Sequence, residues 1–176
     1  GDGDDNKRHW SNADGLSANT ANSLGVRQRL RNRSRYEFDN NSYARGLTLT
    51  LANDLVGTGP VLHVTTEDEV VNDGVMARWR EWCNAVGFGE KLHTLKQAKT
   101  RDGEGFARYI TNPMLPTAVK LDIDVFECDQ CTTHALNVLV LPTNFQAGIV
   151  DGIELDDALN PVFYYVLRQH PGDTST

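Results

Sequence analysis

The stretch that most constrains the fold is residues 31–60, RNRSRYEFDNNSYARGLTLTLANDLVGTGP. It reads as a basic helix, a short Asn-rich break, and an apolar helix. The apolar residues of the second helix recur at the spacing of one helical face, so we expect that face to pack; they are Ala44, Leu47, Leu51 and Leu55. Gly57 and Gly59 supply the positive φ angles that a helix end needs, and Pro60 prevents the helix from resuming.

Five arginines alternate with other residues before the break: Arg27, Arg29, Arg31, Arg33 and Arg35. On a helix they form two rows with Val26 and Leu30 between them. One interpretation is a surface that meets phosphate or a neighbouring acidic subunit. The other, favoured in a chain this acidic, is a surface helix whose arginine stems cover apolar area and whose guanidinium groups pair with carboxylates.

Three more helical segments are expected. One begins near Ser17, with Ser17 or Ser23 as its cap. A second begins at the capping-box spacing of residues 66–69 and ends at Gly87 and Gly89. Its buried side is predicted to hold Val71, Val75, Trp79, Trp82, Cys83 and Val86. The third covers residues 90–100, with Leu92, Leu95 and Ala98 inward. The Trp79–Trp82 pair could stack nucleic-acid bases, but core packing or a subunit contact is the favoured use.

The second half reads as strands. A short strand is possible at residues 61–65, another covers residues 106–111, and residues 112–116 form a turn with two prolines. Val119, Leu121, Ile123 and Val125 alternate with polar residues in the clearest half-buried strand. A further apolar run spans residues 135–141. A hairpin of residues 149–155 and 162–167 is joined by the turn 156–161.

The predicted fold is therefore α+β, with helices from the first half packed on a mostly antiparallel sheet from the second half. We expect a flexible N-terminal tail at residues 1–16, one α+β region at residues 17–172, and a short tail at residues 173–176. A length of 176 residues suits one domain, alone or with an appended subdomain.

The charge balance limits the class of partner. A formal net charge of −7 argues against a chain that grips nucleic acid over its whole surface. The net charge is still compatible with a protein surface that guides DNA past it without binding it tightly. No apolar run reaches the roughly 18 residues that a membrane-spanning helix needs, so no membrane partner is expected. Cys83, Cys128 and Cys131 are an odd number without a secretory signal, which favours free thiols.

Two residue clusters invite a chemical interpretation. Cys128, Cys131 and His134 have the spacing of half a zinc site, but a structural zinc usually needs four ligands. Asp122, Asp124, Glu127 and Asp129 could form a divalent-metal carboxylate cluster, although solvated strand charge is the favoured explanation. There is no phosphate-binding loop, no nucleophile elbow, and no nucleophile beside the scattered histidines. We therefore assign no catalytic or metal-binding residue, no cofactor and no enzymatic activity; nucleic-acid-binding residues stay unassigned.

Five segments, in order along the chain, resemble lambda-type bacteriophage portal proteins. One of them is NNSYARGLTLTLANDLVGTGP (40–60), within the helical stretch described above. The others are HWSNADGLSANTANS (9–23), DGEGFARYITNP (102–113), FECDQ (126–130) and DGIELDDALNPVFYYVLRQHPGD (151–173). Cys128 within FECDQ and Cys131 just after it look like local variation within the family pattern. An ordered set of blocks is more specific than one short motif.

The resemblance implies a structural role. Portal proteins form the ring of identical subunits at the head–tail vertex through which DNA is packaged and ejected. The implied partners are other portal subunits, the terminase motor, capsid and head-completion proteins, and transient, non-specific double-stranded DNA. The implied location is the virion, and the bacterial host cytoplasm during assembly. Because the resemblance covers the N-terminal part of such proteins, we expect a mostly wing-region fragment that lacks the stem, clip and crown.

Two rival functions remain at this point. The first is a metal-dependent nuclease or other hydrolase that uses Asp122, Asp124, Glu127 and Asp129. The second is a small DNA-binding module that acts through Arg27, Arg31 and Arg35 on the basic helix.

Overall fold

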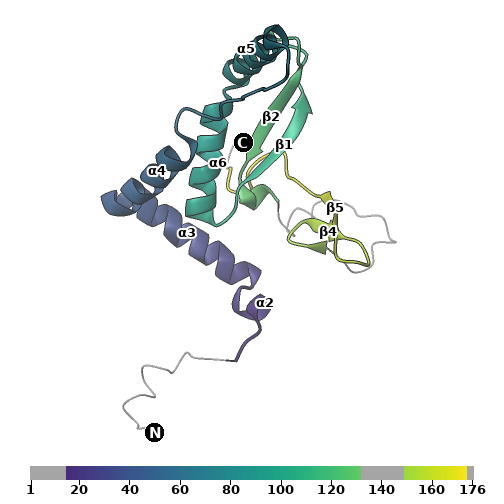
Figure 1. Cartoon of the computed structure of the whole chain (residues 1–176). Coiled ribbons are helices and arrows are strands. Elements are labelled where there is room, and N and C mark those ends of the chain that lie inside the picture. Colours follow the sequence, from purple (N-terminus) through teal and green to yellow (C-terminus); the bar gives the residue numbers. More distant parts are fainter. Residues whose placement is uncertain (1–14, 132–148, 174–176) are drawn as a thin grey trace, which may run out of the picture.

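The computed structural model describes residues 15–131 and 149–173, and it is α+β as predicted (Figure 1). The helices come first along the chain, and the strands that follow form two small antiparallel sheets. The helical elements are α2 (Ala18–Ala21), α3 (Leu24–Asn40), α4 (Ser42–Val56), α5 (Glu69–Val86), α6 (Phe88–Asp102) and the 3-10 turn η1 (Cys128–Gln130). The strands are β1 (Phe106–Thr111), β2 (Leu121–Phe126), β3 (Ile149–Val150), β4 (Ile153–Leu155) and β5 (Pro161–Tyr164). The end of α5 and helix α6 pack on the first of the two sheets.

Polar caps set the helix boundaries. The Ser17 hydroxyl caps α2, and the Asn41 side chain accepts from the amide of Tyr43 at 3.0 Å, so the Asn-rich break both ends α3 and starts α4. Asp68, and not Thr66, caps α5. Thr66 is otherwise engaged, because its hydroxyl donates to the Asn72 side chain at 2.6 Å.

The junction between α5 and α6 is tighter than predicted. Gly87 adopts a left-handed conformation, with φ 61° and ψ 43°, and α6 begins at the next residue. Gly89 therefore lies inside α6 and does not end α5. One left-handed residue is enough to redirect the chain.

The apolar stripe of α4 is not the face that packs. Thr48 and Ala52 are the buried residues of this helix, and Ala52 is 0% exposed. By contrast Leu47, Leu51 and Leu55 are 67%, 47% and 70% exposed. Helix α4 lies against α6. The small residues Thr48 and Ala52 are one turn apart, so a close approach through them leaves the leucines on the flank of the contact.

The core lies where the end of α5 meets the first sheet. Trp82, Val86, Leu115 and Ile123 form its buried centre, with Phe88 and other partly buried side chains around it. The Trp82 indole donates to the carbonyl of Leu121 at 2.8 Å, and its ring centroid lies 5.3 Å from that of Phe88. The predicted core role of Trp82 is thus confirmed.

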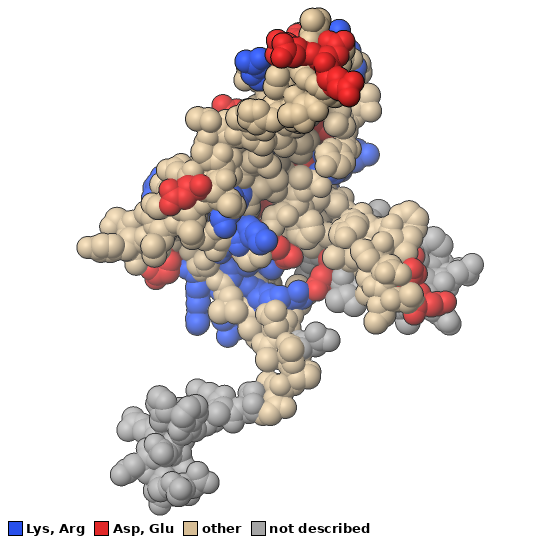
Figure 2. All heavy atoms as spheres, viewed as in Figure 1, with Lys and Arg blue, Asp and Glu red and all other residues tan. Residues whose placement is uncertain are grey.

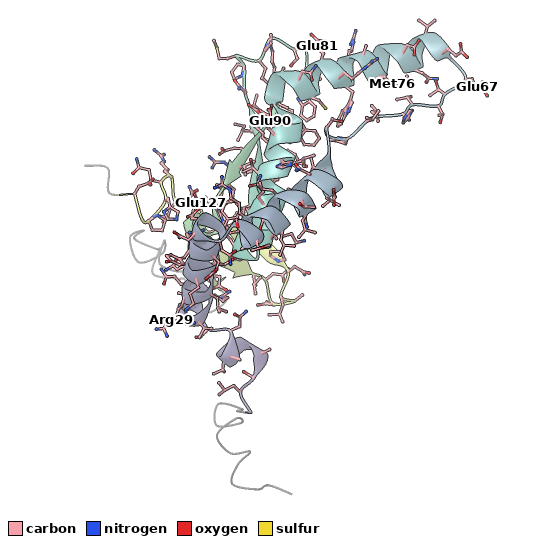
Figure 3. The ribbon with its side chains drawn as sticks, turned by 90° about the vertical axis from the view of Figure 1, so that its left-hand side faces the viewer. Arg29, Glu67, Met76, Glu81, Glu90 and Glu127 are labelled. Carbon is pink, nitrogen blue, oxygen red and sulfur yellow. The ribbon has the colours of Figure 1, made fainter. Side chains whose placement is uncertain are left out.

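The other half of α5 extends away from this core. Val71 and Val75 were predicted to be buried but are 51% and 42% exposed, because only the extended segment 61–66 runs beside them. That segment is not the strand considered from the sequence. In Figure 3 the helix reaches past Met76 toward Glu67 at the far end.

The first sheet follows the prediction closely. Strands β1 and β2 pair antiparallel, with Phe106 opposite Phe126 and Thr111 opposite Leu121. Asn112 shapes the intervening turn by accepting from the amide of Met114. Val119, predicted to belong to this strand, precedes β2 and is 53% exposed.

The second sheet has one more strand than predicted. The expected strand at residues 149–155 is divided by a turn at Asp151 and Gly152, with φ 56° and 78°. Strands β4 and β5 form the predicted hairpin. The bridge between Cys131 and Val166 connects the region after β5 with the residue that follows η1. The predicted run 135–141 lies outside the described residues.

Candidate functional site

The arginine row of α3 meets a group of carboxylates that are distant in sequence. Arg27, Arg31 and Arg35 are one turn apart on the same helix face. Their partners come from the end of α6, from η1 and from the turn before β4. We call this set of ion pairs the arginine junction; its acids are Asp102, Glu104, Glu127, Asp129 and Asp151. Figure 2 shows the basic side chains gathered over this part of the molecule.

Asp102, the last residue of α6, is the most deeply placed carboxylate of the junction, with a side chain only 1% exposed. Arg35 binds it through two nitrogens, at 2.9 and 3.1 Å, and Arg101 does the same at 3.0 and 2.9 Å. Burial acts to raise the pKa of Asp102, but the two guanidinium groups outweigh it and hold the pKa below its ordinary value. Asp102 is therefore ionised at neutral pH.

Asp129 on η1 bridges two arginines. Its carboxylate oxygens lie 2.9 Å from Arg31 and 2.7 Å from Arg35, and the side chains of Asp129 and Arg31 are 12% and 11% exposed. Burial opposes ionisation of Asp129, but both arginines lower its pKa. At the other end of the row, Arg27 contacts Asp151 at 2.5 Å. One helix thus fastens three later segments of the chain.

The two interpretations of the arginine run divide between its two rows. Pairing with carboxylates is confirmed for Arg27, Arg31 and Arg35, and these three are consequently not available as an open DNA-binding surface. Arg29 and Arg33 lie on the other row and are exposed. Within residues 15–131 and 149–173 neither has an ion pair.

The four acids of the hypothetical nuclease site do not converge. Asp122 contacts Lys91 at 2.6 Å and accepts from Asn112 at 3.0 Å; the Lys91 hydrogen bond is the main reason that its pKa falls to about 2. Asp124 pairs across the sheet with Arg108 at 2.7 Å. Glu127 and Asp129 belong to the arginine junction. Each acid therefore has a cationic partner nearby, and the four carboxylates do not form one common site.

The structure does bring one unpredicted group to the acids of η1. The His170 ring nitrogen lies 3.6 Å from Glu127 and 3.5 Å from Asp129, and these three residues have the proximity of metal ligands. However, Arg35 is 2.7 Å from the same oxygen of Asp129 that faces His170. A cation here would compete with a guanidinium. No signal in the sequence connects His170 with residues some 40 positions earlier.

The cysteines are free thiols, as predicted. Cys128 and Cys131 are 3% and 7% exposed, and burial raises the pKa of Cys128 to about 11. Both are therefore protonated at neutral pH in the metal-free chain. His134, the remaining member of the considered zinc half-site, lies outside the described residues.

One protein-family model matches the chain: phage portal protein, lambda family, over residues 4–176. This chain belongs to that family. The resemblance inferred from the five sequence segments is thereby confirmed, and with it a structural role in a phage portal. No curated protein matches the chain.

None of the described helices is both long and apolar enough to span a bilayer.

Proposed function

We propose that this chain is a non-enzymatic packing unit of a portal ring at the virion vertex, assembled in the bacterial host cytoplasm. Its residues 17–172 would form the α+β, wing-like unit, flanked by the short tails at residues 1–16 and 173–176. The observation that carries the proposal is the arginine junction. In it, three arginines of α3 hold the end of α6, η1 and the turn before β4 together through ion pairs, which suits a structural subunit better than a catalytic one.

The proposed partners are those of a portal ring. They are further copies of the chain, the terminase motor, capsid and head-completion proteins, and duplex DNA in passing. DNA contact should be weak and sensitive to salt, because three of the five helix arginines are already paired and the net charge is −7. A channel surface with low affinity for DNA allows a duplex to move past it.

The test of the structural role is self-association of the purified full chain by sedimentation velocity over a wide concentration range. We expect reversible association into species larger than a monomer, because ring subunits carry complementary surfaces. A chain that stays monomeric at every concentration would contradict the proposal.

The test of the non-enzymatic role is incubation of the same protein with plasmid DNA and Mg²⁺ or Mn²⁺. We expect no cleavage above that of a mock preparation, because Asp122, Asp124 and Asp129 are held by separate cations. Metal-dependent cleavage that disappears in Asp124→Ala would instead establish the nuclease.

A further inference from the structure

The outer row of α3 forms a basic and apolar surface that nothing described so far uses. Arg29 and Arg33 are one turn apart on it, and Val26 and Leu30 beside them are 41% and 54% exposed. These four side chains, with Ser23 and Gly25, line a hollow of about 450 Å³. We call this surface the α3 ridge. Large exposed apolar side chains beside two unpaired cations are typical of a contact surface.

The free end of α5 has the complementary composition. Glu69 and Asp73 are one turn apart, and neither has an ion pair within the described residues. On the same side of the helix, Val70 is 82% exposed and Ala77 is also exposed. We call this surface the α5 tip. Figure 2 shows the acidic side chains gathered there, at the opposite end of the molecule from the basic ones around α3.

The two surfaces match in spacing as well as in charge. Each has two like charges at i and i+4, with one large apolar residue immediately after the first charge: Leu30 after Arg29, and Val70 after Glu69. Two helices that pack along these faces can therefore form two guanidinium–carboxylate pairs and one apolar contact together.

The two surfaces cannot meet within one chain. Figures 1 and 3 both place α3 and the free end of α5 at opposite ends of the described fold, and Figure 3 labels Arg29 and Glu67 there. The remaining way to join them is between copies. A contact between different surfaces of identical chains is heterologous, and it generates a ring when the rotation closes.

We infer that the α3 ridge of one copy binds the α5 tip of the next copy. This inference rests on the proposed function, which it deepens by assigning the two surfaces of the subunit contact. The occupant is a second copy of this chain because the α5 tip, among the described residues, supplies two acids without ion pairs and an exposed apolar residue at the spacing that the ridge requires. Duplex DNA on the ridge is the competing outcome.

The experiment inverts each surface separately. Arg29→Glu with Arg33→Glu gives a chain with two acidic surfaces, and Glu69→Arg with Asp73→Arg gives a chain with two basic surfaces. Each variant alone should associate at least tenfold more weakly than the unmodified chain in sedimentation velocity. An equimolar mixture should recover association, because each ridge then meets a tip of opposite charge. Circular dichroism verifies that both variants are folded.

The matched control is Lys96→Glu with Lys99→Glu, which inverts two lysines beside the apolar groove between α4 and α6. It should leave self-association within about twofold of the unmodified chain. If this control abolishes association while the ridge variant does not, the contact lies at that groove and the inference is wrong.

The remaining outcomes separate the inference from the proposed function. An unmodified chain that never associates contradicts the structural role, and the inference fails with it. Association that persists in both inverted variants contradicts only the inference. Binding of a fluorescent duplex that is lost in the ridge variant, with self-association retained, assigns the ridge to phosphate and also overturns the inference.

Discussion

At the scale of single residues, Asp102 shows why the arginine junction depends on burial. Two guanidinium groups converge on a side chain that is 1% exposed, whereas Asp124 and its partner Arg108 are 38% and 59% exposed. Removing the partner of a buried charge greatly lowers the free energy of unfolding, because the remaining charge is left unpaired and poorly solvated. Breaking an exposed pair changes that free energy very little, because water solvates both groups. The two aspartates therefore make a natural comparison.

Asp102→Asn should lower the free energy of unfolding by about 2–4 kcal/mol, because Arg35 and Arg101 lose their common carboxylate while remaining partly solvated. The matched variant Asp124→Asn should cost less than about 1 kcal/mol. Urea unfolding followed by tryptophan fluorescence measures both. Equal costs would show that the junction contributes no more than an ordinary surface pair.

Asp122 predicts a specific dependence of stability on pH. Its pKa is lowered to about 2 in the folded chain, against about 3.9 when unfolded, so the unfolded state binds the proton more readily. The stabilisation by Asp122 is then complete above about pH 5 and is lost as the pH falls from about 4 to 2. The free-energy difference between the chain and Asp122→Asn should shrink over that interval. A difference that is constant down to pH 2 would refute this assignment.

Cys128 predicts slow thiol chemistry. With a pKa near 11, about one thiol in a thousand is a thiolate at pH 8, and the sulfur is also buried. Iodoacetamide should therefore label Cys128 at least a hundredfold more slowly in the native chain than in urea, as read by peptide mass mapping. Rapid labelling of the native chain would indicate an open, reactive thiol.

Sequence reasoning recovered the type of interaction at these residues but not the pairs. An arginine run in an acidic chain favours pairing with carboxylates in general terms. The choice of Asp102 and Asp129 over other acids depends on which segments α3 contacts after folding. Those contacts join residues that are 67 and 98 positions apart, and they carry no periodic signal in the sequence.

At the scale of elements, α4 shows the limit of hydrophobic periodicity. The pattern correctly located a helix and its glycine end, but it chose the leucine stripe as the packed face. The buried residues of α4, which lies against α6, are instead Thr48 and Ala52. Small residues permit close helix approach and are invisible to a search for large apolar ones. Periodicity also predicted that Val71 and Val75 are buried, but the core covers only the second half of α5.

A pair of variants tests which face of α4 packs. Ala52→Leu should cost about 1–3 kcal/mol of unfolding free energy, because extra methyl groups must enter a site with 0% exposure. Leu47→Ala, on a side chain that is 67% exposed, should change it by less than about 0.5 kcal/mol. If the leucine stripe were the packed face, Leu47→Ala would cost about 2–5 kcal/mol. Chemical denaturation distinguishes the two results.

The strands were easier to predict than their grouping. Alternation identified β2, and the two prolines identified the turn before it. The division into two sheets was not predictable, because it depends on a turn at Asp151 and Gly152 within an otherwise continuous apolar stretch. Asp151 also pairs with Arg27, so this turn is held by the distant helix α3 as well as by local backbone geometry.

At the scale of the whole molecule, charge is separated along the fold. Basic groups gather around α3, while the free end of α5 is acidic (Figure 2). A subunit with opposite charges at two different surfaces favours head-to-tail association over symmetric pairing, because like surfaces repel. In a member of the lambda portal family, this separation of charge would favour the head-to-tail contacts of the proposed ring.

The most direct test of the ring is electron microscopy of the full chain at the highest concentration at which sedimentation shows association. The account predicts closed, cyclic particles in which α3 of each copy lies against the free end of α5 of its neighbour. Two-fold symmetric dimers, or monomers alone, would contradict it.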